Sequence, residues 1–110
     1  MDQQINQIKD TILELIVNLI SRMDDLTGNY HQSNTLESDR IVNLLDDLQV
    51  LSEGIEVIKE FYVNLDLSEL SEKLEMMEAA LARKDDRLLA DIMQFELKEL
   101  LLYWETSLSD

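Results

Sequence analysis

The chain has 110 residues, with 24 Asp and Glu against 9 Lys and Arg, a net charge of −15, and neither proline nor cysteine. This composition excludes disulfide bonds and thiolate metal sites, and it disfavours contact with nucleic acid or anionic membranes, because phosphate binding needs clustered lysine and arginine. A hydrophobic content of 45% is ample for a folded core, so we expect one helical-bundle domain over residues 1–110.

The most apolar stretch of the chain lies between Ile12 and Ile20 and carries Glu14 and Asn18. A bilayer span needs ~20 apolar residues, so this stretch predicts a core helix rather than a membrane helix. The N-terminal residues do not combine the basic segment, the apolar segment and the small-residue cleavage site of a secretory signal peptide. Together with the absence of cysteine, these features predict a cytoplasmic protein that does not bind membranes.

The first predicted helix runs from Gln3 to Leu26. Its apolar residues cover about 200° of the helix surface, whereas a helix packed on one side needs only ~100°. We therefore expect it to be central, wrapped by several neighbours or by a second chain, with Ile16 and Leu19 almost fully buried.

A polar loop is expected after the first helix. Gly28 is suited to the left-handed conformation that ends many helices. Asn34 can cap the second helix with Glu37 in the capping-box position, and Ser33 or Thr35 could serve equally. The boundary between the two helices is therefore open.

The second predicted helix, Thr35 to Val63, is expected to be the longest, and it carries two apolar seams. The core seam repeats with steps of three and four residues: Ile41, Leu44, Leu48, Leu51, Ile55, Ile58 and Tyr62. The second seam lies on nearly the opposite side: Val50, Gly54, Val57 and Phe61.

A glycine inside a helix costs ~1 kcal/mol relative to alanine, but its missing side chain lets another helix come close. We predict that the second seam contacts a second helix, from a symmetry-related chain or from a protein partner. The alternative is that the chain's own bundle buries the second helix on both sides.

Two further helices complete the pattern. Asp66 is expected to cap the third helix, which carries a narrow apolar stripe and is therefore peripheral. Residues 83–86 form a tight turn, and the fourth helix, from about Asp86 to Ser107, is apolar over most of its circumference. Four helices joined by three turns predict an all-α, four-helix up-down bundle, with an intertwined helical dimer as the main variant.

Three residues of the fourth helix are candidates for a special role. Glu96 falls inside the apolar face of the helical wheel, so we expect a buried acid paired with a Lys, Arg or Tyr of another helix, with partner recognition as the alternative. Tyr103 and Trp104 are either interface anchors or caps on the end of the core.

No catalytic, cofactor or metal site is predicted. The pairs Asp24-Asp25 and Asp46-Asp47 are typical of a solvated face, and the single histidine, His31, lies outside any Glu-x-x-His repeat. Two glycines are too few for a glycine-rich phosphate-binding loop. With one histidine and no cysteine, few residues are available for a catalytic triad. The sequence favours a protein that is not an enzyme and needs no cofactor.

Surplus apolar helix surface under an acidic shell predicts a protein-interaction module, acting as a small acidic adaptor or chaperone that holds a helix of another protein. In size, acidity and all-helical character the chain resembles the flagellar and secretion export chaperones, although it shares no motif with them. Two alternatives stay open: a structural homodimer without a third partner, and an acidic mimic of nucleic acid that blocks a basic protein.

The excess of negative charge predicts that added salt stabilises the fold. Charges of one sign repel one another on a small domain, and salt screens them with a Debye length of ~10 Å at 0.1 M. We expect the thermal midpoint, followed by circular dichroism, to rise between low salt and about 0.3 M NaCl. A falling midpoint would mean that favourable ion pairs outweigh the repulsion.

Overall fold

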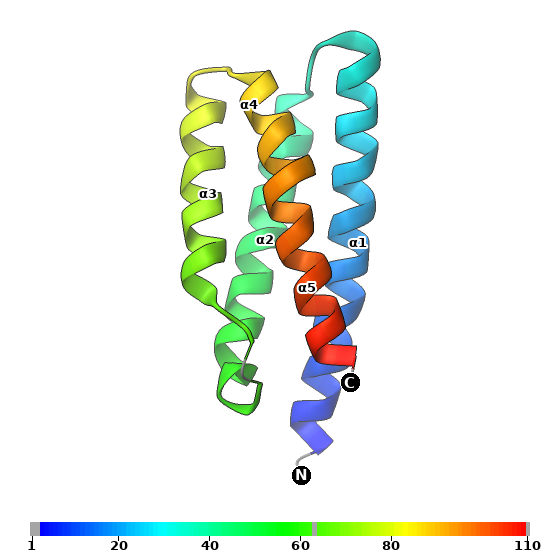
Figure 1. Ribbon diagram of the computed structural model, residues 1–110, viewed down its shortest axis with the longest axis vertical. Helices are drawn as coiled ribbons and strands as arrows, with labels where there is room; N and C mark the ends of the chain where they lie inside the picture. The colour runs from blue at the N-terminus through cyan, green and yellow to red at the C-terminus, as the bar shows by residue number, and fades with distance from the viewer. Residues whose placement is uncertain (1–2, 63, 110) are drawn as a thin grey trace.

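The computed structural model describes residues 3–62 and 64–109, and the regular structure of these residues is entirely helical. Four helical units run up, down, up and down along a body with extents of 48 × 22 × 21 Å (Figure 1). The expected all-α, four-helix up-down bundle is confirmed, and one chain supplies all four helices. No helix in the described part of the chain is both long and apolar enough to cross a membrane.

The first unit is α1 (Gln3–Ser33). The second is α2 (Ser38–Ile58), followed by the short 3-10 helix η1 (Lys59–Phe61). The third is α3 (Leu67–Ala82). The fourth is one continuous rod made of α4 (Asp86–Asp91), the π-helical stretch η2 (Ile92–Leu97) and α5 (Lys98–Ser109).

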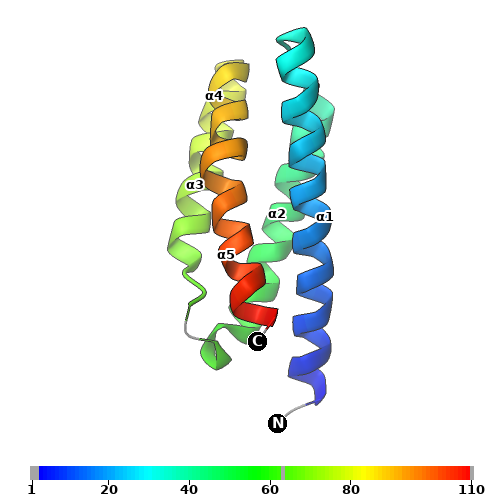
Figure 2. The same cartoon turned by 45° about the vertical axis from the view of Figure 1, so that its right-hand side comes forward.

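The helices surround one continuous hydrophobic core. As Figure 2 shows, α1 lies beside both α2 and α5, and α3 packs against α2, α4 and η2. Ile16 and Leu19 of α1 are fully buried, as expected. The core seam of α2 is also confirmed, because its first six residues are completely buried and Tyr62 packs against them at the edge.

The end of the first helix differs from the prediction. α1 does not end near Gly28 but continues to Ser33, and Gly28 has an ordinary helical φ. The left-handed residue is Asn34, with φ 61°, and its N–H donates to the carbonyl of Tyr30 at 2.7 Å. Asparagine tolerates this conformation better than most residues, so it ends the helix where a glycine was expected.

The second helix is shorter than predicted, which makes α1 the longest helix. It begins at Ser38, and neither Asn34 nor the residue at its N-cap, Glu37, caps it with a side chain. Instead, the carboxylate of Asp86 accepts from the N–H of Leu36 at 3.1 Å. This hydrogen bond fixes the residue before the N-cap and comes from a residue fifty positions away, which no local pattern reveals. Val63, the expected end of the helix, lies outside the described residues.

The turns on either side of α3 agree more closely with the predictions from the sequence. Asp66 caps α3 by accepting from the N–H of Ser68 at 2.9 Å. At the other end Lys84 is left-handed, with φ 57°, and the N–H of Asp85 reaches the carbonyl of Ala80 at 2.9 Å. The N–H of Lys84 donates to the carbonyl of Leu81 at 3.0 Å, and the two bonds together define a Schellman turn. The carboxylate of Asp85 then caps α4 through the N–H of Leu88.

The π-helical stretch keeps the buried stripe of the fourth unit facing the core. Leu89, Met93, Leu97 and Leu101 are buried at steps of four residues. In a regular helix of 3.6 residues per turn such a stripe drifts around the axis, whereas i→i+5 hydrogen bonds widen the turn and hold the stripe in line. The opposite side stays exposed, so this helix is not buried over most of its circumference.

The corrected end of α1 gives a prediction at Gly28. A Cβ built on this residue would meet nothing within 4 Å. Gly28→Ala should therefore raise the free energy of unfolding by about 1 kcal/mol, because alanine is the better helix former. Chemical denaturation measures the change. A loss of stability would indicate that the helix ends at Gly28 after all, because alanine is strained in the left-handed conformation.

Candidate interaction surfaces

A shallow apolar groove lies between α1 and α2. It has a volume of about 260 Å³. Residues of both helices line it: Gln7, Ile8, Thr11, Ile12, Leu15, Val50 and Gly54. We call it the α1/α2 groove. It contains the first half of the predicted second seam, so the seam lies beside an opening rather than on a smooth surface.

Gly54 has a partner within the chain. A Cβ at this position would lie 3.2 Å from both Cγ1 and Cδ1 of Ile12. The missing side chain therefore lets α1 approach α2 closely. This corrects one part of the prediction, because the helix that uses the glycine is α1 of the same chain.

The rest of the second seam is open. Val50, Val57 and Phe61 are 53%, 55% and 50% exposed. The alternative that the bundle buries both sides of α2 is therefore wrong for these three side chains. Antiparallel packing brings the early turns of α1, with the partly buried Ile5 and Ile8, alongside this part of α2 (Figure 1).

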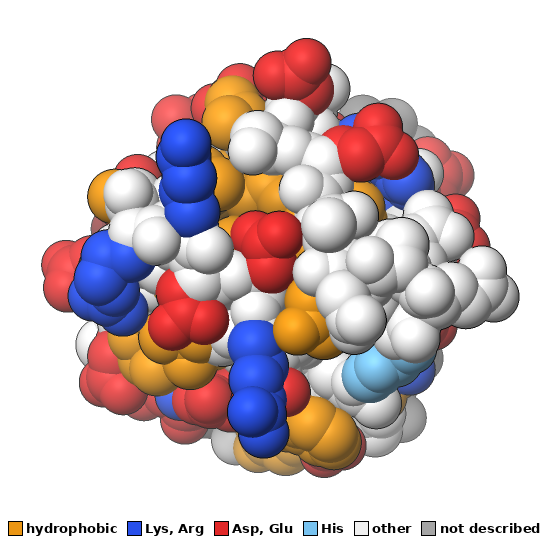
Figure 3. Space-filling model, turned by 90° about the horizontal axis from the view of Figure 1, so that it is seen from above, with side chains coloured by type: hydrophobic (Ala, Val, Ile, Leu, Met, Phe, Trp, Pro, Cys, Tyr) orange, Lys and Arg blue, Asp and Glu red, His pale blue; other side chains and the backbone are white. Residues whose placement is uncertain are grey.

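Acidic residues flank the second seam. Asp46, Glu53 and Glu60 are exposed on the neighbouring side of the same helical rod. At the end of the bundle seen in Figure 3, by contrast, acidic and basic side chains alternate without a row of either kind.

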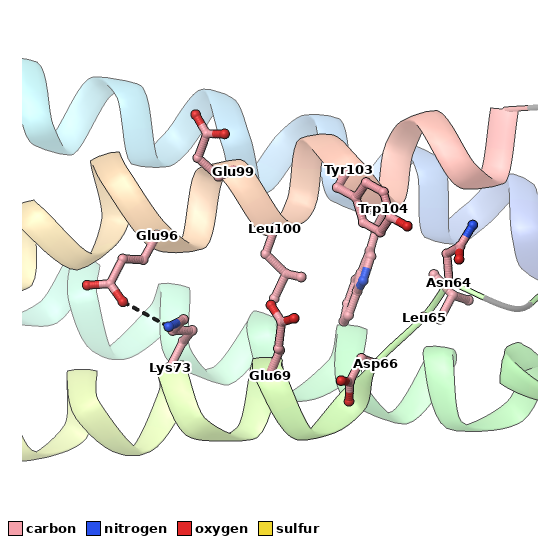
Figure 4. Close-up of a pocket in the computed structure, with 10 residues that line it drawn as sticks. All are labelled: Asn64, Leu65, Asp66, Glu69, Lys73, Glu96, Glu99, Leu100, Tyr103 and Trp104. Atoms are coloured by element: carbon pink, nitrogen blue, oxygen red, sulfur yellow. Dashed lines mark hydrogen bonds and ion pairs between the residues drawn. The ribbon is translucent and has the colours of Figure 1, made fainter.

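A second and larger hollow lies between α3 and α5. Its volume is about 800 Å³, and Figure 4 shows its lining: Asn64, Leu65, Asp66, Glu69, Lys73, Glu96, Glu99, Leu100, Tyr103 and Trp104. We call it the α3/α5 pocket. The three candidates of the fourth helix, Glu96, Tyr103 and Trp104, line this pocket together with Asp66, the expected cap of α3.

Glu96 forms the expected pair with another helix. Lys73 of α3 donates to its carboxylate at 2.8 Å. The expected burial is wrong, because the side chain of Glu96 is 38% exposed. Glu96 belongs to the π-helical stretch. A helical wheel drawn at 100° per residue therefore does not give the side of the helix on which its side chain lies.

Hydrogen bonds, helped at one residue by nearby charges, shift two pKa values in this pocket. The hydrogen bond to Glu96 is the main reason that the pKa of the Lys73 ammonium is raised above its ordinary value of 10.5, and the charges of Glu96, Glu72 and Glu69 add to it. The hydrogen bonds from the hydroxyl and the backbone N–H of Ser68 lower the pKa of the Asp66 carboxyl. Both groups are therefore charged at neutral pH.

Tyr103 and Trp104 separate into two environments. Tyr103 is 51% exposed at the pocket, so it remains available for contact. Trp104 is fully buried, which removes it from the candidate contact surface as an anchor and makes it part of the core. Its indole N–H has no hydrogen-bond partner among the described residues.

The single histidine and the second acidic pair make ordinary polar contacts in the described part of the chain. Nε2 of His31 lies 3.1 Å from the side-chain oxygen of Gln94, at the exposed top of the bundle. Within residues 3–62 and 64–109, no group of three or more His, Cys, Asp or Glu side chains could hold a metal ion. Asp47 of the second acidic pair is bound to Arg22 at 2.6 Å, so it serves the contact between α1 and α2.

Residues 7–107 match the family model described as "Domain of unknown function (DUF8042)", and the chain belongs to this family. The matched range covers most of the four helical units and all the residues that line the α1/α2 groove and the α3/α5 pocket. No curated protein and no solved structure is significantly similar to the chain.

The pair of Lys73 and Glu96 predicts a pH-dependent contribution to stability. Because the folded pKa of Lys73 is raised, the contribution is complete below the ordinary lysine pKa and is lost as the pH rises through the folded value. Glu96→Gln should lower the free energy of unfolding by up to about 1 kcal/mol near pH 8, since the pair is partly exposed. Denaturation at several pH values measures this.

The deficit of Glu96→Gln relative to the wild type should shrink as the pH rises through the raised pKa of the folded-state Lys73 ammonium, where this group loses its proton. Glu72→Gln is the matched control, because this exposed carboxylate lies 3.9 Å from the same ammonium. A deficit that stays constant through the alkaline range would contradict the account, as would equal deficits for the two variants.

Proposed function

We propose that this member of the DUF8042 family is a non-enzymatic protein-interaction module, a small acidic adaptor or chaperone that holds an amphipathic helix of a partner protein. The observation that carries the proposal is the half-exposed row Val50, Val57 and Phe61 beside the α1/α2 groove. Apolar side chains at helical spacing next to an open groove are the usual receptor for a helix.

The shape of the groove suggests how such a helix would lie. Gly54 keeps the floor low at the point where Ile12 crosses it, while Val50 and Val57 stand on either side along α2. A partner helix laid along this line would offer apolar residues at i, i+3 or i+4, and i+7. Its side chains would reach Ile8 and Leu15 on the α1 wall of the groove.

The charge of the surface supports a basic partner. Asp46, Glu53 and Glu60 are exposed along one edge of the second seam, and the whole chain carries a net charge of −15. A helix with Lys or Arg beside its apolar stripe would be attracted during approach and held in register. Two copies of this chain would instead bring their acidic edges together, so the charge favours a different protein over a homodimer.

The absence of an enzymatic role is part of the proposal. The contact of the lone His31 with Gln94 is exposed, whereas general acid–base catalysis needs a proton donor or acceptor positioned in a sheltered site. The larger hollow is lined mainly by charged and polar side chains on an open surface. These features fit binding better than catalysis.

The test uses the second seam with a matched control on the same helix. A synthetic helix with a leucine stripe and lysine flanks is titrated into the protein, and valine methyl signals are followed by NMR. We expect shifts at Val50 and Val57, and binding about tenfold weaker in Val57→Asp. Val42→Asp should bind normally, because Val42 is also exposed but lies outside the seam.

Gly54 is left unchanged in this experiment, because a larger side chain there would strike Ile12 and disturb the contact between α1 and α2. Light scattering on the same samples gives the assembly state. Equal weakening by the two aspartate variants would contradict the proposal, and so would methyl signals that do not move. A dimer of the free protein that only Val57→Asp dissociates would replace the proposal with the homodimer.

A further inference from the structure

The two edges of the α1/α2 groove differ in charge, and contacts within the chain show which edge is which. Gly54 and Asp47 mark the side of α2 that faces α1, because Gly54 packs on α1 and Asp47 binds Arg22 at 2.6 Å. The half-exposed Val50 and Val57 come about 60° farther round the helix, at ~100° per residue. The far edge of the groove is therefore the side of α2 beyond these two valines.

Carboxylates occupy the far edge. Asp46 and Glu53 lie one helical turn before and after Val50, and about 40–60° farther from α1. Glu60 continues the row beside Val57 at the same spacing of seven residues. All three carboxylates are exposed, and none of them forms an ion pair with another residue that the structure describes. They are therefore available to basic side chains of a partner.

The near edge, which α1 forms, is mostly neutral. Gln7 and Thr11 line the groove on this side, and Asn18 follows them along the same face of α1, where its side-chain oxygen accepts from Arg22 at 3.2 Å. Glu14 is the one charged residue among these exposed positions of the edge, 7, 11, 14 and 18. A basic side chain at the groove therefore meets three carboxylates on the α2 edge and one on the α1 edge.

A helix that lies in the groove turns one flank toward each edge. With its apolar stripe at heptad positions a and d, position e lies on one flank and position g on the other. Because every α-helix is right-handed, reversing the direction of the helix exchanges the edges that its two flanks face. Position e faces the acidic edge when the helix runs parallel to α2, and position g faces it when the helix runs antiparallel.

We infer that the charge difference between the edges sets the direction in which the partner helix lies, and that the groove selects helices with Lys or Arg on one flank. Basic residues seven positions apart match the spacing of Asp46 and Glu53. The inference rests on the proposed function, because it takes the groove as the receptor for a helix. It adds the orientation of that helix and its one-sided charge, neither of which the apolar row determines.

Two synthetic peptides of the same composition test the direction. Both carry leucine at positions a and d. One has lysine at every e and glutamine at every g, and the other has the reverse. A nitroxide on the N-terminal residue of each peptide broadens the nearest methyl signals of the protein, and the chemically reduced label gives the reference spectrum.

Val50 and Val57 report the direction, because they lie ~10 Å apart along α2. The peptide with lysine at e should lie parallel to α2, so its label should broaden Val50 more strongly than Val57. The peptide with lysine at g should lie antiparallel and give the opposite order.

Charge variants test whether the acidic edge causes the preference. Asp46→Asn combined with Glu53→Gln should weaken binding of both peptides about fivefold and remove most of the difference in broadening. Glu14→Gln combined with Asp25→Asn is the matched control, because it removes the same charge from exposed positions on α1. The control should keep the direction of both peptides and weaken binding less than about twofold. All four positions are exposed, so circular dichroism should show an intact fold.

The results separate this inference from the proposed function. If neither peptide moves the valine signals, both are wrong. If both peptides bind but their labels broaden the same valine, or both valines equally, the groove holds a helix without orienting it, and only the inference is wrong. Equal weakening by the two double variants would also contradict the inference, because the net charge of the molecule would then account for the attraction.

Discussion

The contact of α1 with both α2 and α5 is the interaction on which the rest of the bundle depends. It buries Ile16 and Leu19 completely, and Gly54 lets α2 come close enough to pack on Ile12. No disulfide bond supports the fold, since the chain has no cysteine. Burial of one apolar core must therefore outweigh the repulsion of a shell with a net charge of −15.

Helical periodicity made the fold and the core seam predictable, because residues from Ile41 to Ile58 repeat at the spacing of one helix face. The ends of the helices were harder, since Asn34 rather than Gly28 takes the left-handed conformation and a carboxylate from Asp86 caps the turn before α2. In the candidate site, the pairing of Glu96 was predictable but its exposure was not. The π-helical stretch changes the facing of that residue, and no single-residue signal marks such a stretch.

The α1/α2 groove and the α3/α5 pocket differ in the chemistry of their side chains. The α1/α2 groove joins apolar side chains to an acidic edge, which suits an amphipathic helix with basic flanks. The α3/α5 pocket joins carboxylates to the half-exposed ring of Tyr103. Both surfaces follow from the composition of the chain. Its helices carry more apolar side chains than the core buries, and the protein surface around them is rich in Asp and Glu.

The central claim is that the second seam holds a helix of another protein. A photo-reactive amino acid placed at position 57, with position 42 as the control, would test it in living cells of the native host. The account predicts one dominant adduct at position 57, with the crosslinked peptide lying in an amphipathic helix that carries basic residues. Adducts that are the same at both positions, or an adduct of the chain with itself, would contradict it.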